Sequence, residues 1–188
     1  MLVPWLYSWR RLVYRCLLVL GFLFLLGMPP VLAGLNDDHF DGNIFVLYGG
    51  NGSLVPPKVP LAEALKRDKP ALVVFYVDDS SDCKRYAPVV SQIQAFYGRA
   101  VNLIPVNVDA LPAKSTYAPT EPGYYYGGVV PQVIVFNQSG QVVLNKKGQV
   151  PYEQVDDTFR EVFNLLPRSE SAELKRRPVN EFNTELTN

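Results

Sequence analysis

The chain has 188 residues, and its 18 basic and 18 acidic side chains leave a formal net charge of zero. Without a net field to attract them, we expect neither nucleic acid nor an acidic substrate as a partner. The two cysteines, Cys16 and Cys83, are too few for a disulfide framework, and His39 alone cannot anchor a zinc site. We expect no cofactor, and the length favours one compact domain with extensions.

Residues 1–35 predict a signal peptide or a membrane anchor. Three arginines (Arg10, Arg11 and Arg15) precede a long apolar run. A basic start, an apolar core and small residues at the end of the segment are typical of an export signal. The apolar stretch also reaches the roughly 20 residues that cross a bilayer, so an uncleaved anchor remains open. In both cases the arginines stay on the cytoplasmic side and the rest of the chain lies on the other side.

The next elements belong to a linker and the start of a domain. Residues 36–58 are predicted to be a polar linker followed by a short strand at 44–48, which ends at a cluster of glycines. Apolar residues at helical spacing predict a short helix over 61–67. Residues 72–77 are apolar on both faces, as in a central strand that is covered by helices on each side.

The second half of the chain predicts the rest of one α/β domain. Residues 109–128 carry three prolines and several tyrosines, which favour an ordered loop over a helix. Residues 167–188 are polar without periodicity and predict a disordered tail. The other predicted elements are a helix over 83–97, a strand over 101–108, a hairpin of 132–136 and 142–146, and an amphipathic helix over 152–166.

Two stretches resemble the signatures of the thioredoxin superfamily. In that family a buried strand runs into a Trp-Cys-x-x-Cys-Lys turn that opens a helix; here strand 72–77 is followed by Cys83 and Lys84 at the second cysteine and its lysine. Residues 128–136 match the second signature, a proline before an apolar strand. The resemblance covers residues 59–166. It implies a three-layer α/β/α fold with a central mixed sheet, preceded by an N-terminal membrane or export helix.

The chain departs from the family at the positions that carry the chemistry. Ser80 stands where the family has its first cysteine, Asp79 where it has the tryptophan, and Val74 where it has an acidic proton acceptor. Disulfide exchange needs an exposed thiolate that attacks and a second thiol that resolves the mixed disulfide. We therefore predict that Ser80 and Cys83 are degenerate active-site positions in a protein that is not an enzyme. The alternative is a membrane-tethered oxidoreductase or redox sensor that uses Cys83 alone.

Peptide binding in a groove is the function that remains for such a domain once the dithiol is lost. In thioredoxins the bond before the signature proline is cis and exposes a backbone edge, so the resemblance places a binding edge at Val130 and Pro131. Tyr124, Tyr125 and Tyr126 precede it and are predicted to form the rim of the groove, since tyrosines are favoured at interfaces. The alternative is that these tyrosines pack on the fold and stabilise the loop.

Charged residues near the helix start have simple explanations. Asp78, Asp79 and Asp82 could suggest a site for a hard cation, but capping of the helix and its dipole explain them better, and we predict no metal site. Lys84 is predicted to be a solvated surface charge. His39 is predicted to be a polar residue of the linker.

The whole layout resembles a group of cyanobacterial thylakoid membrane photosystem I accumulation factors. The features that carry this resemblance are the N-terminal segment, Asp-Ser-Ser-Asp-Cys at 79–83, the loop at 121–128 and the polar tail. The resemblance implies a non-catalytic helper on the lumenal (or periplasmic) side of the thylakoid membrane. Its implied partners are photosystem I subunits or assembly intermediates. A plain structural subunit of a membrane complex is a further alternative.

Overall fold

The computed structural model describes residues 3–26 and 34–171 of the chain, in two separate units divided after Ala33. The first unit contains one helix, α1 (Val3–Leu26). Among the described residues, no helix has both the length and the hydropathy that a membrane span requires. The predicted end of a signal peptide before residue 34 lies outside the described residues.

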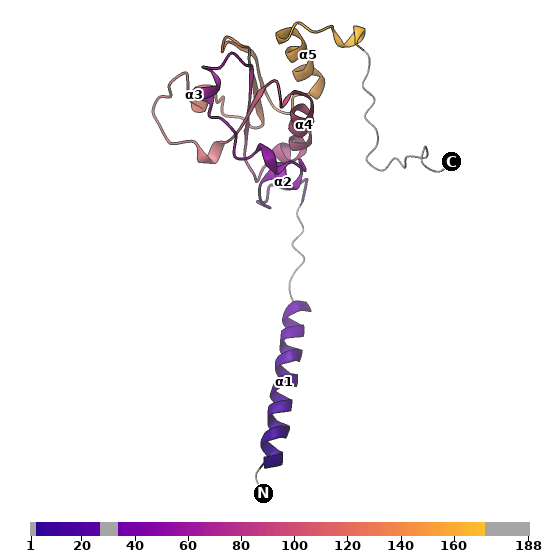
Figure 1. Cartoon of the computed structure of the whole chain (residues 1–188). Coiled ribbons are helices and arrows are strands. Elements are labelled where there is room, and N and C mark those ends of the chain that lie inside the picture. Colours follow the sequence, from indigo (N-terminus) through magenta and orange to yellow (C-terminus); the bar gives the residue numbers. More distant parts are fainter. Residues whose placement is uncertain (1–2, 27–33, 172–188) are drawn as a thin grey trace, which may run out of the picture. The chain divides into compact units, whose positions relative to one another are not determined.

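The second unit is built on a four-stranded mixed sheet (Figure 1). Its strands are β1 (Ala71–Tyr76), β2 (Asn102–Asn107), β3 (Gln132–Phe136) and β4 (Val142–Lys147), in the spatial order β2-β1-β3-β4. The β1–β2 pair is parallel, while β1–β3 and β3–β4 are antiparallel. Every residue of β1 is buried, because this central strand has neighbours on both edges and apolar cover on both faces.

Helices and a long loop cover the two faces of the sheet (Figure 1). One face packs against α2 (Ile44–Leu47), α4 (Ser81–Tyr97) and α5 (Tyr152–Val162), and the other against α3 (Leu61–Ala64) and the loop at 109–128. Alternate residues of β1 enter the two cores, as the period of a strand requires. This arrangement confirms the predicted thioredoxin-like three-layer fold.

The loop at 109–128 is ordered and contains no α-helix, as its prolines predict. Its only regular pieces are two 3-10 turns, η2 (Val108–Ala110) at its start and η3 (Pro122–Tyr124); a third such turn, η1 (Gly52–Leu54), lies earlier in the chain. The predicted hairpin is confirmed by β3 and β4, which pair across the turn at 137–141.

The predicted strand at 44–48 is wrong, because these residues form helix α2. Its cap, Asn43, accepts a hydrogen bond from the Phe45 amide at 3.1 Å, and Asp78 accepts one from the Ile44 amide at 3.0 Å. The second contact joins residues 34 positions apart in the chain. The β-branched and aromatic residues favour a strand locally, but tertiary capping and burial select the helix.

The C-terminal end of the domain is more ordered than the sequence predicts. Helix α5 ends at Val162, and a 3-10 turn, η4 (Arg168–Glu170), follows it. The Arg168 guanidinium donates to Asp156 at 3.0 Å and to the Glu153 carbonyl at 2.7 Å, which ties this turn to α5. The predicted disordered tail thus has an ordered beginning, and its remainder, 172–188, lies outside the described residues.

Candidate functional site

The candidate site is the N-terminal end of α4, where thioredoxins carry their dithiol. Ser80 is the N-cap of this helix, and its hydroxyl accepts a hydrogen bond from the Cys83 amide at 3.3 Å. A capping side chain of this kind satisfies one of the free amides of the first helical turn. Ser80 therefore has a structural role at the position where the family has its attacking thiol.

Cys83 is buried in the core beneath this turn. Its exposed fraction is 1%, and it belongs to the cluster on the α2, α4 and α5 face. Burial raises the pKa of the Cys83 thiol, and the nearby carboxylates of Asp82 and Asp78 raise it further. A buried thiol with a raised pKa is a poor nucleophile. Cys16 and Cys83 are both free.

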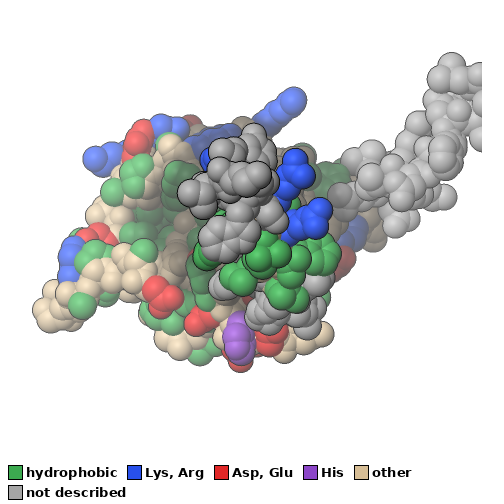
Figure 2. Space-filling view, turned by 90° about the horizontal axis from the view of Figure 1, so that it is seen from below, with side chains coloured by type: hydrophobic (Ala, Val, Ile, Leu, Met, Phe, Trp, Pro, Cys, Tyr) green, Lys and Arg blue, Asp and Glu red, His purple; other side chains and the backbone are tan. Residues whose placement is uncertain are grey.

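The segment 34–43 supplies a second cap to the same helix end. The Asp38 carboxylate accepts a hydrogen bond from the Ser81 amide at 2.8 Å, and this bond lowers the pKa of Asp38. The first amides of a helix and its dipole form a ready site for an anion. The chain's own carboxylate occupies that site. Figure 2 shows acidic side chains (red) around the histidine (purple) that lies next to Asp38 in the sequence.

Lys84 holds the same segment from inside the domain. Its exposed fraction is 0%, so the prediction of a solvated surface charge is wrong. The Lys84 ammonium donates to Asp41 at 2.7 Å, to the Asp37 carboxylate at 3.0 Å, to the Asp37 carbonyl at 3.1 Å and to the Gly34 carbonyl at 3.0 Å. Asp41 also accepts from the Tyr48 hydroxyl at 2.6 Å.

The electrostatics around Lys84 favour the charged forms of Lys84, Asp37 and Asp41. Burial by itself lowers the pKa of Lys84, but the hydrogen bonds and charges of Asp41 and Asp37 outweigh it and raise the pKa. The hydrogen bond from Lys84 in turn holds the pKa of both carboxyl groups below the ordinary range. A buried ammonium is tolerated only when it is paired and fully hydrogen-bonded, and these contacts meet that need.

Residues 34–43, which include the predicted polar linker, therefore form a strap that is fastened to the domain. We use the name "strap" for this segment, which Lys84 and the Ser81 amide fasten beside the degenerate active site. Sequence reasoning missed Asp37, Asp38 and Asp41. The available signal was the density of aspartates just before α2, but nothing in the sequence indicates their partners.

The other acidic residues near the start of α4 do not form a common site. Asp78 accepts hydrogen bonds from the Ile44 amide and from Asn107 at 3.0 Å each, and burial raises the pKa of its carboxyl group. Asp82 accepts from Arg85 at 2.6 Å, and Asp79 lies exposed. Across residues 3–26 and 34–171, no group of three or more acidic, histidine or cysteine side chains could hold a metal ion.

The predicted binding edge lies beside the end of β1. The Val130–Pro131 bond is cis, and Pro131 is buried. The register pairs Phe75 with Gln132, so Val130 lies just beyond the end of β1, where the chain turns toward α4. Within the part of the chain that the structure describes, the Pro131 carbonyl accepts from the Gly148 amide at 2.7 Å, whereas the backbone groups of Val130 have no partner.

The three loop tyrosines have different environments. Tyr125 packs edge-on against Phe136 with ring centroids 5.0 Å apart, and Tyr126 lies 5.4 Å from the Phe75 ring. These two tyrosines therefore pack on the fold and stabilise the loop. Tyr124 is 56% exposed. Of the three, it alone offers most of its surface to a partner.

Comparisons with known proteins agree with this fold. The family model described as a thioredoxin-like domain matches residues 58–163. The chain is 47% identical over 193 residues to the thylakoid membrane protein slr1796 of Synechocystis sp., covering 98% of this chain and 96% of that protein. It is 30% identical over 101 residues to the thiol:disulfide interchange protein TxlA homolog of the same organism, covering 54% of this chain and 53% of that protein. The chain therefore belongs to the thioredoxin-like family and to the same family as the thylakoid membrane protein slr1796.

Proposed function

We propose that this chain is a non-catalytic thioredoxin-like protein of the thylakoid membrane that supports photosystem I accumulation by binding a protein partner. The thylakoid location of the relative supports the membrane part of the proposal. The resemblance in layout to photosystem I accumulation factors supports the assignment to photosystem I subunits or assembly intermediates.

The proposal rests on one observation: the end of α4 where thioredoxins carry their dithiol has no exposed thiol and is covered by the strap. The first cysteine is replaced by the capping Ser80, and Cys83 is buried. The helix amide that would face a substrate is bonded to Asp38 of the strap. A site in this state has neither an exposed nucleophile nor a free anion pocket, so binding is the role that its surroundings favour.

The edge at Val130 is the proposed contact for the partner. Unpaired backbone groups beside a sheet can pair with an extended segment, and side chains next to them add selectivity. Tyr124 and Val129 are the exposed large side chains of this region. Gly128 has a φ of +78° and open space at the position where a Cβ would lie, which leaves room for a second chain to approach.

Variants of this edge test the proposal in a deletion strain complemented with the full chain. Tyr124→Ala with Val129→Ser should lower photosystem I levels, because truncation of an interface anchor commonly costs about 2 kcal/mol, roughly thirtyfold in affinity. Cys83→Ser should leave the levels near normal. The matched control is Leu165→Ala with Val142→Ser, which truncates two side chains of similar exposure (52% and 42%). Leu165 follows α5, and Val142 pairs with Phe136 at the end of β3 away from Val130.

The choice of residues follows from the packing of the loop. Replacing Tyr125 and Tyr126 as well would remove ring contacts with Phe136 and Phe75 and confuse folding with binding. Each variant must therefore match the parent chain in its thermal unfolding. The opposite ranking, with Cys83 essential and the Tyr124 edge dispensable, would refute the binding role.

We also propose that the domain lies on the lumenal side. The basis is the positive-inside rule, since Arg10, Arg11 and Arg15 precede the apolar part of α1. Protease added to the cytoplasmic face of sealed membranes should leave the domain intact, and detergent should make it accessible. Digestion of the domain before detergent is added would reverse the assignment.

A thiol–disulfide role is the second candidate, and the similarity to the TxlA homolog favours it. Such a role would have to use Cys83, since Cys16 lies in α1 outside the thioredoxin-like domain. The buried thiol would first have to become accessible. Disulfide reduction by the full chain that disappears in Cys83→Ser would establish this function in place of the first.

A further inference from the structure

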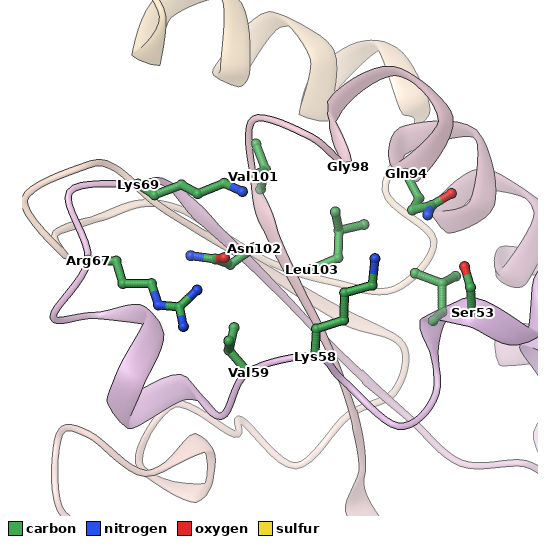
Figure 3. Close-up of a pocket in the computed structure, with 11 residues that line it drawn as sticks. Ser53, Lys58, Val59, Arg67, Lys69, Gln94, Gly98, Val101, Asn102 and Leu103 are labelled. Atoms are coloured by element: carbon green, nitrogen blue, oxygen red, sulfur yellow. The ribbon is translucent and has the colours of Figure 1, made fainter.

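A cavity of about 240 Å³ lies beside the start of β2, the edge strand of the sheet (Figure 3). Ala71 and Asn102 pair at the first residues of β1 and β2, whereas α4 begins just beyond the last residue of β1. The cavity is therefore at the opposite end of these strands from the degenerate active site. None of the residues discussed for that site lines it.

Asn102 brings an unused donor to this cavity. The residue is 7% exposed, and its Nδ2 has no hydrogen-bond partner among the described residues. Buried polar groups in native proteins are nearly always hydrogen-bonded, and an exception calls for an explanation such as a ligand. Neither hydrogen of this amide is bonded within the described part of the chain, although the residue lines the cavity.

Three basic side chains surround the same space. Lys58 precedes α3, while Arg67 and Lys69 lie in the turn between α3 and β1. Figure 3 shows the Asn102 amide nitrogen directed between the side chains of Lys69 and Arg67. Arg67 also pairs with Glu63 one helical turn earlier, whereas Lys58 and Lys69 have no ion-pair partner in the described part of the chain. Positive charge is thus concentrated here in a chain with no net charge.

The size and chemistry of the cavity define its ligand. Its volume lies below the range of about 300–1,000 Å³ that is typical of pockets for drug-sized ligands. Two lysines, an arginine and an amide donor suit a compact group with several acceptor oxygens and a negative charge. We propose that this cavity binds a phosphate- or sulfate-type oxyanion, either free or as the headgroup of an anionic lipid. The inference does not depend on the proposed partner of the Val130 edge.

Binding can be measured on the full chain in a neutral detergent. Inorganic phosphate is titrated at constant ionic strength with chloride as the reference ion, and the Asn102 side-chain amide is followed by NMR. We expect a saturable shift of this signal. Lys58→Gln with Lys69→Gln should weaken phosphate binding at least about tenfold, which corresponds to about 1.4 kcal/mol. The matched control is Lys66→Gln with Lys146→Gln, which removes the same charge from exposed sites outside the cavity.

The two double variants decide the result. Loss of affinity in the cavity variant and its retention in the control support the site. Equal weakening in both variants would mean that phosphate responds only to overall charge and would overturn the proposal, as would a shift that never saturates. Because phosphate also stabilises proteins by exclusion from their surfaces, a rise in thermal stability without the Asn102 shift counts against the site.

Lipid nanodiscs separate the two sources of the anion. The full chain is placed in phosphatidylcholine discs with or without phosphatidylglycerol, in buffer without phosphate. A shift of the Asn102 signal that requires phosphatidylglycerol identifies a lipid headgroup, and a shift that requires added phosphate identifies the free ion. Either result supports the site. Absence of the shift under both conditions would overturn it.

Discussion

Replacing Lys84 with methionine should release the strap from the domain and lower the Tm by about 5–10 °C. Methionine keeps most of the buried apolar stem of the lysine but removes the ammonium that holds Asp41 and Asp37. These carboxylates would then lose the ammonium that neutralises them and would face the apolar methionine side chain. Thermal unfolding of the full chain by circular dichroism measures the loss of stability, and hydrogen exchange of the Ser81 amide measures release of the strap.

A control and a double variant make this prediction specific. Lys146→Met removes an exposed lysine and should change the Tm little. Asp41→Asn should destabilise the domain less than Lys84→Met, because the amide can still accept from Tyr48. If Lys84 and Asp41 act as a pair, the double variant should lose less stability than the sum of the two single changes. Strict additivity would show that the two residues are not energetically coupled.

The pH dependence of stability follows from the same cluster. The pKa values of Asp37 and Asp41 are lowered from 3.8, so their contribution is present above pH 3.8 and is lost as the pH falls through the folded values. The pKa of Lys84 is raised from 10.5, so its contribution is complete below pH 10.5 and is lost as the pH rises through the folded value. The stability difference between the parent chain and Lys84→Met should therefore be flat between these limits and shrink outside them.

The full chain should show no dithiol–disulfide exchange above background in an insulin-reduction assay. Ser80 cannot attack a disulfide, and Val74 cannot accept the proton that the reaction releases. Loss of a general base alone commonly removes a factor of about 10² or more. Cys83→Ser should leave this background unchanged, because the buried thiol takes no part in it. A turnover that vanishes in Cys83→Ser would contradict the prediction.

Restoring the first thiol should not restore the enzyme. Ser80→Cys should give at most weak activity, since the Asp38 carboxylate at the start of α4 disfavours a thiolate there. Adding Asp38→Asn should lower the pKa of the introduced thiol, which alkylation rates measured against pH would report. If Asp38→Asn leaves the alkylation profile unchanged, the strap does not control the electrostatics of this helix end.

Local patterns in the sequence are enough to predict the main strands and helices of the domain. Residues 72–77 are apolar on both faces, and the structure makes β1 the buried central strand. The polar residues before Cys83 and the apolar periodicity after it predicted α4, which begins with the Ser80 cap. The hairpin of β3 and β4 followed from two apolar runs around a short turn. These features depend on neighbours within a few residues, so the sequence displays them directly.

Only the tertiary structure decided the environment of the candidate site. Lys84 looks like an ordinary surface lysine after the helix start, but its partners lie 43 and 47 residues away in the strap. The helix at α2 depends on Asp78, 34 residues away from Ile44. The cavity at Asn102 brings together segments that the sequence separates by a helix and a strand. Charge pairing, capping and burial of this kind depend on distance in space, and no periodicity along the chain records them.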